Sequence, residues 1–227
     1  PDNELALFQQ GVCFYKLNYR SEAQKNFKKL LENNPDHYNS KYYLALINYE
    51  NEKFSESIPL FLDLLQYDSK NYEIYNYLGD SYLKTNNLKL ALSSYRQSLK
   101  LNAYDANIYY QIGLIYEQLL NIEEAIKNYN QAINMDDNNN DLIYRLGMIL
   151  YQDGQYKKSL EYLRRHLLYQ PKDIQVIKIL SRTSVLNSDK RQYYQFKVRQ
   201  DGKLIATYHM FAQKSNYWRL LLPVKKT

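Results

Sequence analysis

Small side chains recur along this sequence at one constant interval. The first set consists of Gly11, Ala45, Gly79, Gly113 and Gly147. Each member stands thirty-four residues after the one before it, and we call this step the repeat interval. A second set with the same step, twelve residues further on, consists of Ala23, Ser57, Ala91, Ala125 and Ser159. A large residue follows each member of the second set by four positions, at Phe27, Phe61, Tyr95, Tyr129 and Leu163. This regular self-similarity predicts a stack of repeated units that share one continuous core.

The spacing also predicts what each unit contains. Small residues at a fixed helical position let two helix backbones approach closely, and large residues fill the space beside them. We therefore expect a helix A over about the first fourteen residues of each unit and a helix B over about the last fourteen. Turn signals such as Asn86-Asn87 and Asp153-Gly154 fall between the expected helices.

These positions resemble the tetratricopeptide repeat, whose pattern has small residues at its eighth and twentieth positions and Pro near its end. The resemblance covers residues 4–173 and implies five repeats, at residues 4–37, 38–71, 72–105, 106–139 and 140–173. Pro35 and Pro171 occupy the closing position, whereas Ser69, Ala103 and Asp137 replace Pro in the middle repeats. The implied fold is an all-α, right-handed solenoid of five helix pairs.

The end of the chain departs from the repeat. Residues 174–187 predict a sixth helix of type A that caps the stack, but it is apolar on more than one side. Residues 188–227 follow as an extension, in which Tyr194, Phe196 and Val198 alternate with polar residues before Asp201-Gly202. This pattern predicts a β-hairpin whose second strand spans residues 203–211, and we expect the hairpin to cover the sixth helix as a cap.

Basic residues are concentrated in the same end. Residues 174–227 contain eleven Lys and Arg against two Asp, a net charge of +9, which leaves −3 for residues 1–173 of a chain whose total is +6. This surface could contact an acidic protein, an anionic membrane or a nucleic acid, or it could be a Lys-protected strand surface. The candidate basic residues are Lys190, Arg191, Lys197, Arg199 and Lys203.

The resemblance implies that unpacked residues of the A helices line a concave groove that binds a partner protein or peptide. The predicted groove residues are Tyr42, Tyr43, Asn76, Tyr77, Asp80, Tyr110, Gln111, Tyr144, Arg145 and Arg182. Tyr is ordinary for the family at the position of Tyr42, Tyr110 and Tyr144, so a structural role for these stays open. The Lys and Asn set with which one subclass binds C-terminal carboxylates is absent, because Phe8, Tyr42 and Asn76 stand where its first Lys would be.

Catalysis has little support in the sequence. His37, His166 and His209 fall in dissimilar places, and neither a metal-ligand spacing nor a phosphate-binding loop is present. We expect no catalytic residues, no metal and no cofactor, and we expect Cys13 to be a small core residue of the first helix.

Three functional hypotheses follow: a scaffold or adaptor that binds a partner segment in its groove, a basic hairpin as the working surface, or a repeat module of a larger assembly or enzyme. Homo-oligomers through the C-terminal region also remain open. No apolar run approaches the ~18 to 20 residues that span a bilayer, so we expect a soluble protein. Because the chain begins at Pro1, a cytoplasmic location and, after loss of an N-terminal signal, a periplasmic or membrane-anchored one stay open.

Overall fold

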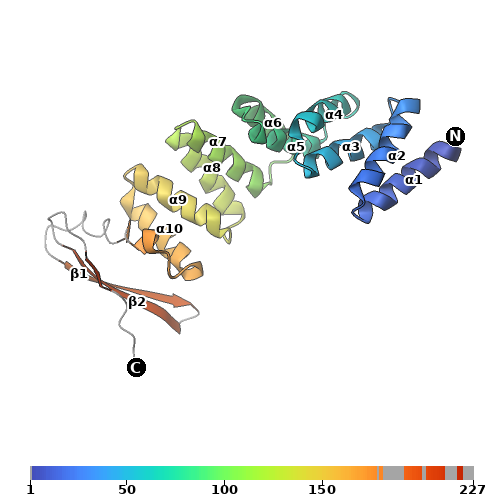
Figure 1. The fold of residues 1–227 in the computed structure, drawn as a ribbon. Coiled ribbons are helices and arrows are strands. Elements are labelled where there is room, and N and C mark those ends of the chain that lie inside the picture. Colours follow the sequence, from blue (N-terminus) through green and yellow to red (C-terminus); the bar gives the residue numbers. More distant parts are fainter. Residues whose placement is uncertain (1, 178, 181–191, 201–202, 213–218, 222–227) are drawn as a thin grey trace. The chain divides into compact units, whose positions relative to one another are not determined.

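The computed structural model describes residues 2–177, 179–180, 192–200, 203–212 and 219–221, and it describes side chains between residues 4 and 180 except that of residue 178. Helices joined by short turns make up the described chain as far as residue 180, and strands follow from residue 192 (Figure 1). The chain divides into two compact units, residues 1–108 and 109–227, and each is described by itself.

Antiparallel helices packed in pairs make up the first unit. Its helices are α1 (Asp2–Lys16), α2 (Arg20–Asn33), α3 (Tyr38–Glu50), α4 (Phe54–Tyr67), α5 (Tyr72–Lys84) and α6 (Leu88–Leu101). Each odd-numbered helix packs on the helix that follows it, and α2 and α4 also pack on the first helix of the next pair. Helix α7 (Ala106–Gln118) contains the boundary between the units.

The second unit continues the helical pattern and ends in strands. After α7 it contains α8 (Ile122–Met135), α9 (Asn140–Gln152) and α10 (Tyr156–Tyr169). Helix α9 packs on both α8 and α10. None of the described helices combines the length and apolar character needed to cross a bilayer.

The glycines of the first small set lie where helix A meets its partner helix B. A Cβ atom added at Gly11 would lie 2.7 Å from the ring of Phe27, and one at Gly147 would lie 2.6 Å from Leu163. At Gly79 and Gly113 an added Cβ would meet the rings of Tyr95 and Tyr129. These four large side chains are fully buried. Close approach at the small residues, which the spacing predicted, is therefore observed in both units.

A capping residue precedes each A helix after the first, again at the repeat interval. The five caps are His37, Asn71, Asp105, Asn139 and Asp173. Each side chain accepts a hydrogen bond from the backbone N–H three residues later, at N–acceptor distances of 3.0 to 3.2 Å. These bonds satisfy amide donors that the first turn of a helix leaves without intrahelical partners.

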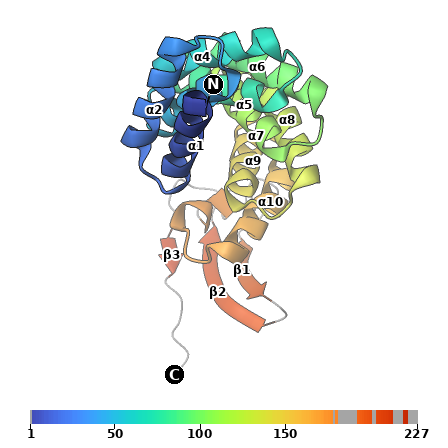
Figure 2. The ribbon, with the colours of Figure 1, turned by 90° about the vertical axis from the view of Figure 1, so that its right-hand side faces the viewer.

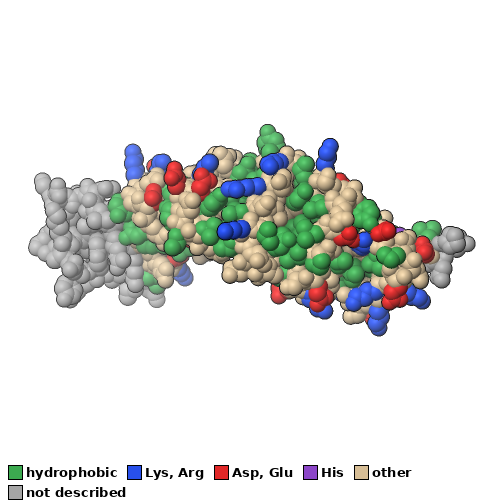
Figure 3. Space-filling view, turned by 90° about the horizontal axis from the view of Figure 1, so that it is seen from above, with side chains coloured by type: hydrophobic (Ala, Val, Ile, Leu, Met, Phe, Trp, Pro, Cys, Tyr) green, Lys and Arg blue, Asp and Glu red, His purple; other side chains and the backbone are tan. Residues whose placement is uncertain are grey.

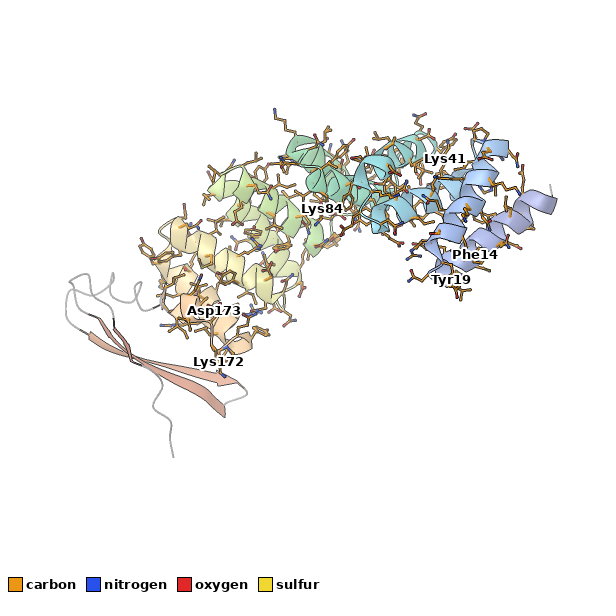
Figure 4. The ribbon with its side chains drawn as sticks, in the orientation of Figure 1. Phe14, Tyr19, Lys41, Lys84, Lys172 and Asp173 are labelled. Carbon is orange, nitrogen blue, oxygen red and sulfur yellow. The ribbon has the colours of Figure 1, made fainter. Side chains whose placement is uncertain are left out.

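The first five A helices end in the same backbone conformation. Asn18, Glu52, Asn86, Leu120 and Gly154 all have a positive φ, between 57° and 78°. The N–H of the residue after each of them donates to a carbonyl five positions earlier, as from Tyr19 to Phe14 at 2.8 Å. This pattern is the Schellman motif, in which a left-handed residue ends a helix. The rings of Tyr19 and Phe14, labelled in Figure 4, also meet edge to face at 6.3 Å.

The sixth helix begins where it was predicted. Residues 174–177 and 179–180 are helical, and Asp173 caps their first turn. Val176, Ile177 and Leu180 are buried against Leu163 and Leu167 of α10. The buried His166 ring joins this junction to α9, because Nε2 lies 3.2 Å from Asp173 and Nδ1 lies 2.9 Å from Asn140 (Asp173 in Figure 4). The predicted end of the helix lies outside the described residues.

Strands β1 (Gln192–Gln200) and β2 (Lys203–Ala212) pair antiparallel, with Phe196 opposite Tyr208 (Figure 2). Their register shifts between Val198 and Arg199. Strand β3 (Arg219–Leu221) pairs with the other edge of β2, so the strand order is β1-β2-β3. The two long strands stand where the alternating pattern predicted them. Their turn, and their packing as a cap on the sixth helix, lie outside the described residues.

The prediction for Cys13 is wrong, because this side chain is exposed. The equivalent residues of the next four repeats, namely Ile47, Ser81, Ile115 and Ile149, are at most 1% exposed. At Ile47 the side chains that cover this position are Ala23 and Phe27 of the preceding helix pair. In residues 2–180, no pair precedes α1, so the same position faces solvent.

We predict that Gly113→Leu lowers the free energy of unfolding by about 1 to 3 kcal/mol, because the added side chain must displace the buried ring of Tyr129. Thermal unfolding followed by circular dichroism measures the change. Gln118→Leu, on the exposed part of the same helix, is the matched control and leaves the midpoint nearly unchanged. Equal midpoints for the two variants would contradict the close approach.

Leu120 offers the opposite test. It combines a φ of 57° with 84% exposure, so its side chain adds backbone strain and little packing. We predict that Leu120→Gly raises the free energy of unfolding by about 1 kcal/mol. Gly154→Ala, at the matching position of the next repeat, should lower it by a similar amount although open space surrounds that site. Changes of the opposite sign in urea titrations would refute the Schellman assignment.

Candidate partner-binding faces

Tyrosine rings that stack on buried phenylalanine rings lie on one face of the first unit. We name it the α3–α5 face: Asn39, Tyr42, Tyr43 and Tyr49 of α3 with Glu73, Asn76, Tyr77 and Asp80 of α5. Tyr43 stacks on Phe27 with ring centroids 5.2 Å apart and an interplanar angle of 9°. Tyr77 stacks on Phe61 at 5.2 Å and 7°, which repeats the same contact in the next helix pair.

A second ring meets each of these tyrosines edge-on. Tyr15 lies 5.1 Å from Tyr43, and Tyr49 lies 5.0 Å from Tyr77. Edge-to-face and offset stacked contacts are the favoured arrangements of aromatic pairs, so the neighbours fix each ring in place. Tyr43 and Tyr77 are nevertheless only half-buried. Figure 3 shows that hydrophobic side chains, a class that there includes tyrosine, are widely exposed on the visible face.

Asp80 accepts two hydroxyl hydrogen bonds at this face. The Tyr49 hydroxyl donates to Oδ2 at 2.8 Å, and the Tyr95 hydroxyl donates to Oδ1 at 2.5 Å. Burial, and then the nearby carboxylate, raises the pKa of both tyrosines far above the ordinary value. Both hydroxyls therefore remain protonated donors at neutral pH, and Asp80 is held in one orientation between two repeats.

The second unit carries a polar network at the corresponding positions. Arg145 Nε donates to Asp141 Oδ2 at 3.0 Å, and Arg145 Nη1 lies 3.8 Å from Glu117 Oε2. The Tyr110 hydroxyl donates to Asp141, and the Tyr129 hydroxyl donates to Glu117 at 2.6 Å. Burial and the bond to Asp141 raise the pKa of Tyr110 to about 12. The guanidinium of Arg145 thus lies between the carboxylates of Asp141 and Glu117. Each carboxylate also accepts a hydrogen bond from a tyrosine hydroxyl.

The two units carry different residue types at two equivalent positions of the repeat. Arg145 stands two repeat intervals after Tyr77, and Glu117 stands two after Tyr49. The edge-on aromatic pair Tyr49–Tyr77 of the first unit is therefore replaced by the ion pair Glu117–Arg145 in the second.

The structure places most of the predicted groove residues on these surfaces. Tyr42, Tyr43, Asn76, Tyr77 and Asp80 belong to the α3–α5 face, and Tyr110 and Arg145 belong to the network of the second unit. Tyr144 lies 4.9 Å from the ring of His166 and packs on the core, whereas Gln111 is half-buried on α7.

The remaining candidates fall outside what the structure describes. Arg182, Lys190 and Arg191 are not among the described residues. Lys197, Arg199 and Lys203 lie in β1 and β2, but their side chains are not described. Within residues 4–180, no cluster of three or more His, Cys, Asp or Glu side chains has an arrangement that could hold a metal ion.

Two features were missed by the sequence analysis. Tyr95 and Tyr129 were treated as packing residues only, yet their hydroxyls hold Asp80 and Glu117. Arg20 was also missed: its guanidinium lies 4.2 Å from the centroid of the Tyr15 ring and 2.8 Å from Glu50. A signal was present for the first, because tyrosine at a buried position needs a partner for its hydroxyl.

We predict an acid-sensitive contribution of Asp141 to stability. Burial raises its pKa, but the hydrogen bonds from Tyr110 and Arg145 outweigh burial and hold the pKa below its ordinary value. A lowered folded-state pKa stabilises the fold above the unfolded-state pKa, and this contribution is lost as pH falls through the folded one. Asp141→Asn should therefore cost about 1 kcal/mol or less at pH 7 and nothing near pH 2.

Urea unfolding of the wild type and of Asp141→Asn between pH 2 and pH 7 measures this difference. Asp153→Asn, which changes an exposed aspartate after α9, is the matched control for loss of a surface carboxylate. A difference between wild type and Asp141→Asn that is constant over this pH range would exclude the predicted linkage.

Sequence profiles of tetratricopeptide repeats match most of the chain: one matches residues 8–71, a second matches residues 79–119, and a third matches residues 106–139 and 141–173. A comparison with curated protein sequences gave no match.

Solved structures share the fold at low identity. MamA residues 41 to the end from Desulfovibrio magneticus RS-1 is 18% identical, with a TM-score of 0.68, over 76% of this chain and 98% of that one. YrrB, described as a TPR protein with an unusual peptide-binding site, is 20% identical, with a TM-score of 0.66, over 76% and 89%. A tetratricopeptide repeat protein from Parabacteroides merdae is 17% identical, with a TM-score of 0.67, over 82% and 74%.

The repeat interval, the paired helices with small residues at their contacts, and the profile matches agree with one another. This chain belongs to the tetratricopeptide repeat family.

Proposed function

We propose that this chain is a non-enzymatic scaffold that binds a segment of a partner protein on the exposed sides of its A helices. The α3–α5 face is the part of this surface that we assign first. The five repeats with the boundaries expected from the sequence, and the β1–β2 hairpin as a cap on the sixth helix, belong to the same proposal.

The observation that carries the proposal is the double support of Tyr43 and Tyr77. Each ring is fixed by a stacked Phe and an edge-on Tyr, yet each remains half-exposed. A fixed ring loses little conformational entropy when a ligand packs on it, and its hydroxyl gives a polar contact at the same place. Such a surface suits an extended or helical peptide.

The comparisons support the same class of function at the level of the fold. The chain is a tetratricopeptide repeat protein, and repeat stacks of this kind present extended binding surfaces. YrrB, which shares the fold, is described as having a peptide-binding site. The likeness to YrrB supports a peptide ligand here, while the residues that bind it are assigned from this chain's own geometry.

We predict that a bulky neutral group on the α3–α5 face abolishes partner binding. Asn39 is exposed on α3, three and four residues before Tyr42 and Tyr43, so it lies on the same side of the helix. The test introduces Asn39→Cys in a Cys13→Ser background, attaches a polyethylene glycol maleimide, and compares native partners recovered by affinity purification and mass spectrometry. Labelled Asn39→Cys should recover at least tenfold less of each specific partner than unlabelled protein.

The control carries the same label at Gln97→Cys, an exposed position on helix B α6. This protein should recover the full set of partners, because α6 contributes no residue to the α3–α5 face. Circular dichroism confirms that both labelled proteins keep their helices. Partner recovery that is equal for the two labelled proteins would reject the α3–α5 face as the binding surface.

A further inference from the structure

Four acceptor groups share one side of α5. Glu73, Asn76, Tyr77 and Asp80 follow one another at intervals of three, one and three residues, which places them on one face of the helix. They present two carboxylates, an amide carbonyl and the π-face and hydroxyl of a tyrosine. Their partners within this chain show which of these groups are still available to a ligand.

Glu73 is an exposed carboxylate to which no cation is paired. Within residues 4–180, it takes part in neither a hydrogen bond nor an ion pair. Burial and then the charge of Glu73 raise the pKa of Tyr77, and burial, Tyr77 and then Glu73 raise the pKa of Tyr42. The negative charge of Glu73 therefore acts on the surface that the tyrosines form.

Asn76 contributes an acceptor without a donor. Its Oδ1 atom is buried, and no group of the described structure donates a hydrogen bond to it. A buried acceptor that receives no hydrogen bond is destabilising, and it adds to the negative potential of this side of α5. The side chain as a whole is half-exposed, but its Oδ1 atom is not accessible from the face.

Asp80 adds a second negative charge that no cation neutralises. Its hydrogen bonds come from the neutral hydroxyls of Tyr49 and Tyr95. Lys84, labelled in Figure 4, follows one turn later on α5 and forms no ion pair with it in the described structure. Among the described residues, a cation is therefore what this side of α5 lacks.

The first unit holds its own cations with the same combination of groups. Arg20 lies 4.2 Å from the centroid of the Tyr15 ring and 2.8 Å from Glu50. Lys41 lies 5.3 Å from the centroid of the Tyr67 ring and pairs with Asp63. A tyrosine ring beside a carboxylate binds a cation by cation–π attraction and ion pairing together. Tyr77 and Glu73 repeat this combination, and the structure places no cation between them.

We propose that the α3–α5 face binds a basic, extended segment of a partner protein, whose Lys or Arg side chain lies over Tyr77 and pairs with Glu73. This inference rests on the proposed function, because it names the chemistry of the segment that the face binds. It adds that charge complementarity, and not apolar contact alone, selects the partner.

The test selects peptides from a random twelve-residue phage library on the full chain and measures the affinity of the strongest synthetic peptide by fluorescence anisotropy. We expect selected sequences to be enriched in Lys and Arg relative to the unselected library. Glu73→Gln should weaken binding about two- to fivefold, and the wild-type affinity should fall as salt rises. Glu32→Gln, an exposed glutamate on α2, is the matched control and should leave the affinity unchanged.

The possible failures are distinguishable. If selected peptides are neutral or acidic but lose binding when Asn39→Cys is labelled, the inference is wrong and the proposed function stands. If no peptide is selected, or if selected peptides bind the labelled protein fully, the proposed function fails as well. If light scattering shows a dimer that Glu73→Gln disrupts, the occupant is the basic segment 188–227 of a second copy, and the assignment to another protein is overturned.

Discussion

Close approach of two helices at a single small residue is the constraint on which the rest of the structure depends. A Cβ at Gly11 would fall 2.7 Å from the Phe27 ring, so the two helices of the pair can meet at this distance only when the side chain is missing. The same contact recurs at Gly79, Gly113 and Gly147. Because one geometry joins the two helices within each of these pairs, the large residues packed against the glycines return to an equivalent environment after each repeat interval.

Backbone hydrogen bonding follows the same interval and makes the joints reproducible. The side chains of His37, Asn71, Asp105, Asn139 and Asp173 cap the A helices, although they belong to three residue types. A left-handed residue ends each of the first five A helices, and at Leu120 it does so against the preference of the side chain. Tertiary packing therefore determines these backbone conformations, and local propensity adjusts their cost.

The interval was sufficient to predict the paired helices, whereas the candidate site residues came from the family resemblance. It could not predict hydrogen-bond partners, because position within a repeat does not say which polar side chain of the packed helix lies opposite. The roles of Tyr95 and Tyr129 depend on Asp80 and Glu117, which stand fifteen and twelve residues away on another helix. Cys13 was mispredicted for a related reason, since its burial requires a preceding helix pair that the described chain lacks.

The same two positions of the repeat form an aromatic contact in one unit and an ion pair in the other. Tyr77 and Tyr49 form an aromatic pair in the first unit, and Arg145 and Glu117 form an ion pair at the same positions in the second. A buried aromatic side chain of helix B supports each arrangement. Phe61 stacks on Tyr77 in the first unit, and the Tyr129 hydroxyl donates to Glu117 in the second. Because the supporting contact tolerates the exchange, the exposed residues can change what a unit binds without changing how it folds. The carboxylates of the second unit hold a guanidinium between them, whereas Glu73 and Asp80 pair with no cation among the described residues.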